Sequence, residues 1–251
     1  MITKKLDAFF KDVLAIDAIE DVSLNGLQVD NDGADIKKIA FATDACMETF
    51  NRAAVAGAGM LFVHHGLFWG KPLALIGSHR ARLKFLLDKN IALYAAHLPL
   101  DKHPQYGNNA ALARKLGVVN PEPFGSYHGH KIGWKGRLET PLTIEELVLR
   151  VSFMGREPLS VLRFGANRVL NVAVVSGDAP EFVSEAVAEG VDLFVTGEAS
   201  HTWHHFALES RINVIAGGHY STEVWGVRAM MDLCAEKLDM DVEFIDVPTG
   251  L

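Results

Sequence analysis

Two stretches of this chain resemble each other in sequence and in order. Residues 37–46 read KKIAFATDAC and residues 170–180 read LNVAVVSGDAP, while Leu-Phe-Val occurs at both 61–63 and 193–195. A third pair consists of apolar runs that end in histidine, at His97 and at His219. The offsets are 134 residues (44 to 178), 132 (61 to 193) and 122 (97 to 219). Three matches in one order predict an internal duplication of a βαβαβ unit.

The patterns of apolar residues within both stretches predict alternating strands and helices. The expected strands are 36–43, 60–64, 91–96, 169–176, 191–195 and 212–216, and the expected helices are 45–56, 79–89, 180–189, 200–209 and 222–237. This alternation predicts an α/β fold with largely parallel sheets, built as two related three-layer α/β domains with a metal site between them. Residues 118–130, rich in Pro, Gly and His, are the expected boundary, which gives domains 1–125 and 126–251.

Composition restricts the class of protein. The 251 residues are 49% hydrophobic with a formal charge of −7, which indicates a globular chain and does not favour a general polyanion or nucleic-acid binder. Only Cys46 and Cys234 are present, so a disulfide framework or zinc finger is not expected. No apolar run reaches the ~20 residues of a membrane span, and the N-terminus lacks a signal-peptide core. We expect a cytoplasmic protein.

Potential metal ligands gather where the predicted strands end. They are His64, His65, His97, Asp101, Glu198, His219 and Glu223. Loops that leave the carboxyl ends of parallel strands meet at one edge of a sheet, where sites are commonly built. Adjacent histidines in an extended strand point to opposite sides, so His64 and His65 suit two metal ions about 3.5–4 Å apart.

Five of these residues also have a purely structural interpretation. His64 and His65 would then be ordinary loop histidines, and Asp101, in an extended turn after Pro99, would be an N-cap or Asx-turn residue. Glu223 would interact with a helix dipole. His97 fits a donor to a metal ligand, a proton shuttle or a core histidine equally well.

Other histidines carry weaker signals. His201, His204 and His205 share one face of a predicted helix, but the glutamate of the metalloprotease motif is absent, which favours surface or interface histidines. His128 and His130 lie in the expected boundary. Phosphate-binding, dinucleotide-binding and nucleophile-elbow motifs are absent from the sequence.

Five motifs, taken in order, resemble the Nif-three-like family, whose members are often described as type 2 homologues of GTP cyclohydrolase I. They are Asn25-Gly-Leu-Gln-Val29, Val63-His-His-Gly66 with Trp69, Ala96-His-Leu-Pro-Leu-Asp101, Thr196-Gly-Glu198 and Gly218-His-Tyr-Ser-Thr-Glu223. The match runs from about residue 20 to the C-terminus. Leu24 replaces a proline often found before Asn25-Gly26, which should affect only a turn.

The resemblance implies a dinuclear metal site between two related domains and a toroidal homohexamer built as a trimer of dimers. Its five metal ligands carry over to His64, His65, Asp101, His219 and Glu223. Such a mixed nitrogen and oxygen set suits two divalent ions per subunit, either Zn, Mn or Fe.

Two functions remain open from the sequence. The first is a metal-dependent hydrolase that acts on a nucleotide or another phosphorylated or anionic small molecule, with Glu198 or His97 transferring protons. GTP ring opening is one version, implied by the resemblance alone. The second is a non-enzymatic metal-binding scaffold, metallochaperone or interaction protein.

Overall fold

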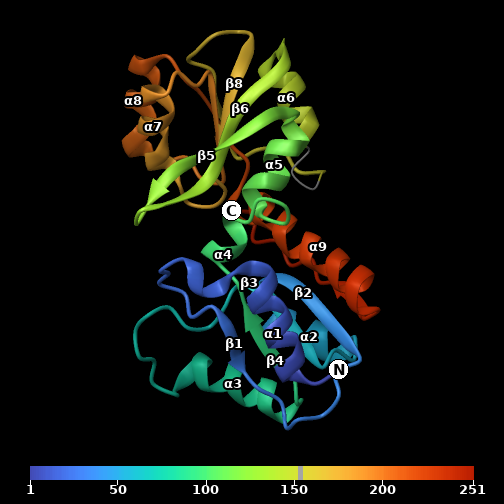
Figure 1. The fold of residues 1–251 in the computed structure, drawn as a ribbon. Coiled ribbons are helices and arrows are strands. Elements are labelled where there is room, and N and C mark those ends of the chain that lie inside the picture. Colours follow the sequence, from blue (N-terminus) through green and yellow to red (C-terminus); the bar gives the residue numbers. More distant parts are fainter. Residues whose placement is uncertain (152–154) are drawn as a thin grey trace. The chain divides into compact units, whose positions relative to one another are not determined.

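The structure, a computed structural model, describes residues 1–151 and 155–251. The chain forms two compact units: Met1–Leu100 with Gly226–Val247, and Asp101–Trp225 with Pro248–Leu251. This division differs from the expected boundary between residues 125 and 126, because the chain leaves the first unit earlier and returns to it near its C-terminus (Figure 1).

The first unit is built on a five-stranded sheet. In sheet order its strands are β1 (Gly26–Val29), β4 (Ala92–Ala95), β3 (Met60–His65), β2 (Lys38–Asp44) and β11 (Asp241–Phe244). All neighbours are parallel except β1, which runs antiparallel to β4. The helical segments that lie wholly in this unit are α1 (Thr3–Leu14), η1 (Ile16–Ala18), α2 (Met47–Val55) and α3 (Gly77–Asp88).

An aromatic row covers one face of this sheet. Phe41 pairs with Phe62 and Phe62 with Tyr94 in the strand register. Phe10 of α1 lies on the row, with ring centroids 5.0 Å from Phe62 and 4.8 Å from Tyr94. Burial of one such side chain contributes roughly 1.5–3 kcal/mol. The other face packs against α2 and α3 through Phe50 and other buried apolar residues, so the unit has three layers.

The second unit is built on a six-stranded sheet. Its strands, in sheet order, are β5 (Val118–Tyr127), β6 (His130–Leu142), β8 (Val169–Val174), β9 (Leu193–Thr196), β10 (Asn213–Ala216) and β7 (Ser160–Leu162). Strands β8, β9 and β10 are parallel. The helical segments are α5 (Asn108–Leu116), α6 (Ile144–Val151), η3 (Pro180–Phe182), α7 (Val183–Ala188) and α8 (His201–Ser210). Two helices, α4 (Leu98–Asp101) and α9 (His219–Leu238), contain the points where the chain changes unit.

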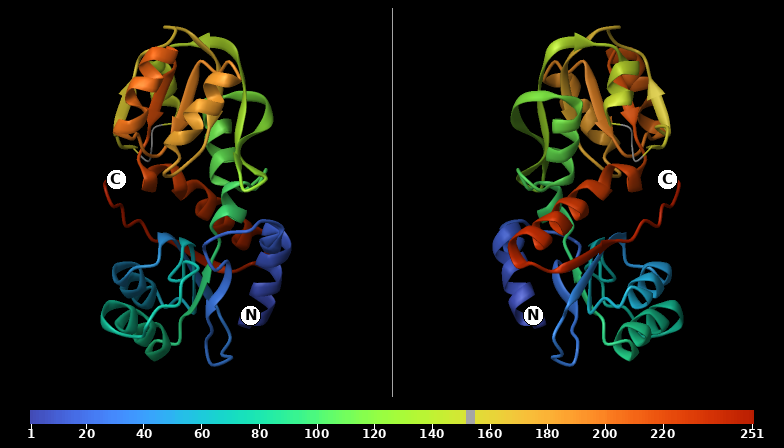
Figure 2. Two further views of the ribbon diagram at one scale, coloured as in Figure 1. Left: turned by 90° about the vertical axis from the view of Figure 1, so that its left-hand side faces the viewer. Right: turned by 90° about the vertical axis from the view of Figure 1, so that its right-hand side faces the viewer.

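Helices cover both faces of this sheet as well. Leu112 of α5 and Leu147 of α6 pack with Val172 and Val195 in one core. On the other face, α7 and α8 pack over Phe194 of β9. Figure 1 shows this sheet between the two pairs of helices, and in the left view of Figure 2 the orange helices α7 and α8 lie in front of it. The predicted α/β class with two related three-layer domains is therefore confirmed, and each unit contains the order strand, helix, strand, helix, strand with three parallel strands.

Two local expectations are wrong. Residues 118–130 do not mark the boundary between the units: they lie inside the second unit, where 118–127 form β5 and the turn that follows leads into β6. Pro121 and Pro123 fit there because β5 is an edge strand, where a missing N–H need not break a ladder. Pro99 does not hold an extended turn: it is the second residue of α4, and a proline is tolerated in the first turn of a helix. In the described part of the chain, no helix has the length and apolarity needed to cross a membrane.

Candidate metal centre

Three histidines of the first unit lie together at the ends of neighbouring strands. His64 and His65 end β3, and His97 follows β4. One ring nitrogen of each lies within 4.8 Å of the others. The rings of His64 and His65 are 4.5 Å apart, so the expectation that they point to opposite sides is wrong at this strand end.

Hydrogen bonds fix the tautomers of the two adjacent histidines. His64 Nδ1 lies 2.8 Å from the carbonyl oxygen of Ala96, and His65 Nδ1 lies 2.8 Å from Asp44 Oδ1. A carbonyl or carboxylate oxygen can only accept, so each Nδ1 carries the hydrogen and each Nε2 has the lone pair. This arrangement is typical of metal-binding histidines, which donate their other N–H to such an acceptor.

His97 is held by a buried aspartate. Its Nδ1 lies 3.0 and 3.1 Å from the two carboxylate oxygens of Asp21, whose side chain is only 2% exposed. Asp21 also accepts from the backbone N–H of Leu98 and the side chain of Asn25. Burial opposes ionisation, but the hydrogen bond and charge of His97, with the hydrogen bonds of Asn25 and Ser23, lower the pKa of Asp21 to about 2.

This shift predicts an acid-sensitive contribution to stability. The folded-state pKa of Asp21 lies below its unfolded value, so the contribution is present above about pH 4 and is lost as the pH falls toward about 2. A shift of this size corresponds to about 2 kcal/mol. We expect Asp21→Asn to flatten the loss of unfolding free energy between about pH 5 and pH 2 by that amount. Urea titrations across this range measure it, with exposed Asp30→Asn as control; identical profiles for wild type and both variants would contradict it.

Two side chains of the segment 25–29 accept hydrogen bonds from the backbone of the loops that carry this cluster. Asn25 accepts the backbone N–H of His97 at 2.7 Å, and Gln28 accepts that of Leu67 at 2.8 Å. A Cβ atom on Gly66 would collide with the Gln28 amide, which explains the glycine after the two histidines. The Trp69 ring lies 5.1 Å from the His97 ring in an edge-to-face arrangement. The Asn25–Val29 motif thus positions the loops that carry the histidines.

The second unit brings together two buried carboxylates. Asp101 is 5% exposed and Glu223 is 3% exposed, and an oxygen of one lies within 4.8 Å of an oxygen of the other. Asp101 Oδ1 accepts from Asn108 Nδ2 at 2.9 Å and from Ser176 Oγ at 3.2 Å. Two buried carboxylates repel each other unless a cation or proton lies between them, so the pair suits a metal ion.

His219 lies at the start of α9 between two carboxylates. Its Nδ1 is 2.6 Å from Glu198 Oε1, and its Nε2 is 3.0 Å from Glu223 Oε2. Glu198 follows β9, and the backbone N–H groups of Gly197 and Glu198 both donate to the carbonyl oxygen of Gly177. Gly177 has φ of +71°, and a Cβ atom there would collide with the Glu223 carboxylate. Glu198 therefore orients His219, as Asp44 orients His65.

The predicted residues thus fall into two clusters, one in each unit. The first contains His64, His65 and His97, and the second contains Asp101, Glu198, His219 and Glu223. Sequence reasoning missed the residues that orient them, namely Asp21, Asp44, Asn108, Ser176 and Gly177. Asp44 and Ser176 gave a signal, because Asp44 directly follows the predicted strand 36–43 and Ser176 ends the predicted strand 169–176 within the repeat.

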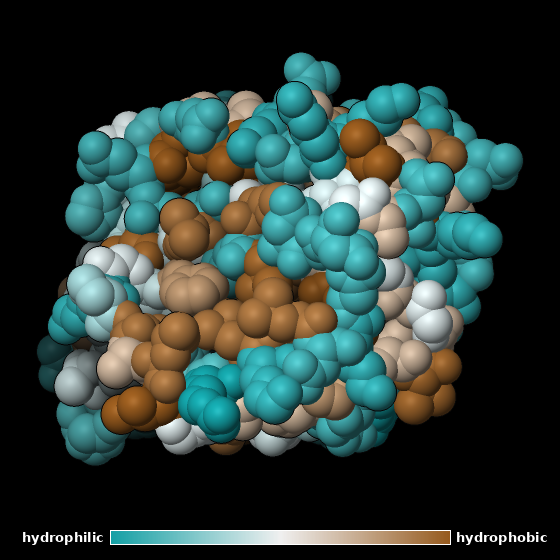
Figure 3. Space-filling view, turned by 90° about the horizontal axis from the view of Figure 1, so that it is seen from below, coloured by the Kyte–Doolittle hydropathy of each residue, from teal (hydrophilic) through white to brown (hydrophobic). Residues whose placement is uncertain are grey.

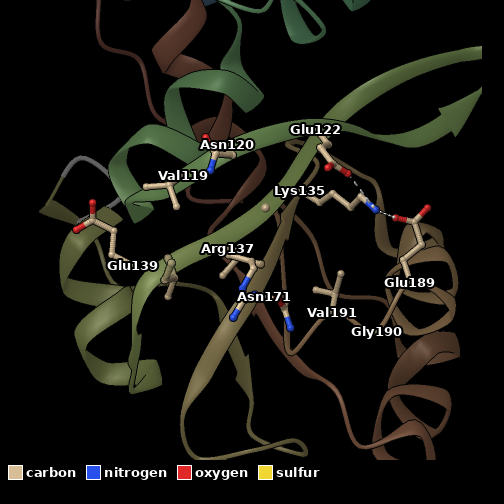
Figure 4. Close-up of a pocket in the computed structure, with 13 residues that line it drawn as sticks. Val119, Asn120, Glu122, Lys135, Arg137, Glu139, Asn171, Glu189, Gly190 and Val191 are labelled. Atoms are coloured by element: carbon tan, nitrogen blue, oxygen red, sulfur yellow. Dashed lines mark ion pairs between the residues drawn. The ribbon is translucent and has the colours of Figure 1, made fainter.

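Other features do not form a comparable site. His201 and His205 lie on the exposed side of α8 with ring centroids 6.4 Å apart, and His204 contacts Phe164. His128 and His130 lie at the β5–β6 turn. A cavity of about 530 Å³ beside β6 contains Lys135 and Arg137, but Lys135 pairs with Glu189 at 2.7 Å (Figure 4). Among the described residues that line this cavity there is no histidine, cysteine or serine.

Comparison with known proteins identifies the family. A family model described as Duf34/NIF3 (NGG1p interacting factor 3) matches residues 1–249. An Archaeoglobus fulgidus protein named GTP cyclohydrolase 1 type 2 homolog is 45% identical over 243 residues, 97% of each chain. A solved structure described as protein ybgI of unknown function has a TM-score of 0.92 at 36% identity, and a Thermus thermophilus protein has one of 0.91 at 38%; both comparisons cover 100% of each chain. The chain belongs to the DUF34/NIF3 family.

Proposed function

We propose that the two clusters form one dinuclear metal centre and that the protein is a metal-dependent hydrolase. The proposed ligands are His64, His65, Asp101, His219 and Glu223. One observation carries the proposal. Each of the three histidines in this set directs Nδ1 at an oxygen acceptor 2.6–2.8 Å away, which orients Nε2 for metal binding.

The path of the chain supports joining the clusters. Asp101 is the first residue of the second unit and follows directly on the segment that begins with His97. Glu223 lies three residues before Gly226, where α9 enters the first unit. Two ligands of the second unit therefore lie next in sequence to the points where the chain changes unit, which supports a metal shared with the first unit.

The chemistry follows from the donor set. Two divalent ions, when bound, supply Lewis-acid chemistry: they polarise the bond under attack and lower the pKa of water. We infer Zn, Mn or Fe, because histidine and carboxylate ligands suit these ions. His97, fixed by Asp21, and Glu198, whose side chain is 42% exposed, are the proposed proton-transfer residues.

The proposed substrate is a nucleotide or another phosphorylated or anionic small molecule. Two cations attract anionic oxygens in an otherwise acidic chain. The relatives named GTP cyclohydrolase 1 type 2 homolog make GTP the first compound to test. We also infer a homohexamer for this chain.

A panel of nucleotides, phosphomonoesters and esters, assayed with each metal, tests the proposal. We expect metal-dependent turnover that is abolished in His65→Ala and Glu223→Ala and retained in His201→Ala. Turnover unaffected by the first two variants would contradict the proposed centre. Metal binding without turnover on any compound would instead favour a metal-binding scaffold or interaction protein, which the family description as an interacting factor also supports.

A further inference from the structure

Three large apolar side chains are exposed beside the histidine cluster of the first unit. They are Val22 at 57%, Leu24 at 53% and Trp69 at 38% exposure. Figure 3 shows further apolar areas on the face of the molecule seen from below, so exposure alone does not single out a site. These three side chains are distinguished by their place next to the candidate metal centre.

Two backbone contacts join the segments that carry these side chains. The N–H of Leu24 donates to the carbonyl oxygen of Phe68 at 2.9 Å. Gly70 has φ of +71°, and a Cβ atom there would lie 3.2 Å from the carbonyl oxygen of Val22. This close approach brings the two exposed aliphatic residues to the segment that contains Trp69.

The indole of Trp69 is held in place with part of its surface exposed. Its Nε1 donates to the carbonyl oxygen of Gly66 at 3.0 Å. The ring centroid lies 5.1 Å from that of His97, at an interplanar angle of 77°, and 5.8 Å from that of His65. The side chains of His65 and His97 are themselves 17% and 19% exposed. A fixed aromatic surface therefore lies next to a proposed metal ligand that solvent can reach.

Support of His97 does not account for this exposed ring. Asp21 already fixes His97 through both carboxylate oxygens and also accepts the backbone N–H of Leu98. An aromatic ring that only packed against the histidine would gain most from full burial. Flat aromatic side chains that stay accessible beside a polar site are typical platforms for stacking a nucleic-acid base, which needs no hydrogen-bond readout.

We propose that Trp69 stacks on the purine or pyrimidine base of the substrate and that Val22 and Leu24 contact the same base or its sugar. The inference rests on the proposed function and narrows its substrate class to nucleotides. Small-molecule sites combine such apolar contacts with a few polar groups, here those of the metal centre. Residues 66–76 contain Lys71 as their single charged residue, so this segment does not repel a phosphorylated compound.

Equilibrium binding to the full-length protein loaded with Zn²⁺ or Mn²⁺ tests the inference, with GMP and ribose 5-phosphate as probes. These compounds differ only in the base. We expect the wild type to bind GMP at least tenfold more tightly than ribose 5-phosphate. Trp69→Leu should abolish this difference without changing the affinity for ribose 5-phosphate or the metal content. Trp69→Phe, which keeps an aromatic ring, should retain most of it, and Trp134→Leu, at a partly buried tryptophan of the second unit, is the control.

Fluorescence provides a second readout that a purely structural role of Trp69 would not change. A base stacked on an indole quenches its emission. GMP should therefore quench the emission of the wild type and of Trp134→Phe, and the part of this signal that belongs to Trp69 should be absent from Trp69→Phe. Equal quenching in all three proteins would overturn the stacking.

The outcomes separate this inference from the proposed function. Equal affinity of the wild type for GMP and ribose 5-phosphate would overturn the stacking and leave a metal centre that binds anions. A loss of both compounds and of metal in Trp69→Leu would show that Trp69 only positions the histidines, and would also overturn it. Binding of neither compound to the metal-loaded wild type would contradict the proposed substrate class itself, and the inference with it.

Discussion

Alanine in place of either His64 or Glu223 should remove both metal ions from the protein, not one. His64 belongs to the cluster of the first unit and Glu223 to that of the second. If the clusters form one dinuclear centre, each ligand contributes to holding both ions in place. Loss of a residue that only orients a ligand typically weakens metal affinity ~10–100-fold, and loss of a ligand should cost at least as much.

The measurement is elemental analysis after dialysis against metal-free buffer, together with thermal unfolding with and without added metal. A metal present at a hundred times its dissociation constant stabilises the fold by about 2.7 kcal/mol, so the wild type should gain melting temperature and the variants should not. His201→Ala controls for surface histidines. Two independent half-sites would give a different result: each single variant would lose one ion, and only the double variant would lose both.

The central strands of both units follow from the sequence because buried parallel strands form short apolar runs between helices. The edge strand β11 does not. β11 reads DVEF and pairs with β2, although the two are far apart in the chain: Lys38 contacts Glu243 across 205 positions. Neither its length nor its pattern predicts a strand, and only the return of the chain through α9 brings it to the sheet.

The candidate ligands were accessible to sequence reasoning for a similar reason. Residues at the carboxyl ends of parallel strands share an edge whatever their side chains contact. No such rule predicts the positions of the residues that orient the histidines. Asp21 reaches His97 across 76 positions and Asp44 reaches His65 across 21, and in each case the spacing is set by the packing of loops. The histidine directions were mispredicted, although both residues lie within β3 and His65 pairs with Asp44.

Gly177→Ala should weaken the second cluster without removing a ligand. At φ of +71° any side chain costs about 1–2 kcal/mol, and a Cβ at this position also collides with the Glu223 carboxylate. Relief by displacing Glu223 would turn it away from His219 Nε2, now 3.0 Å distant, and we expect metal affinity to fall at least tenfold. Gly190→Ala is a matched control, since Gly190 has φ of +68° and nothing within 4 Å of the added atom. Both variants should lose unfolding free energy in urea, but only Gly177→Ala should lose metal. Equal metal retention in the two would mean that the Glu223 carboxylate can move without consequence, and would remove it from the ligand set.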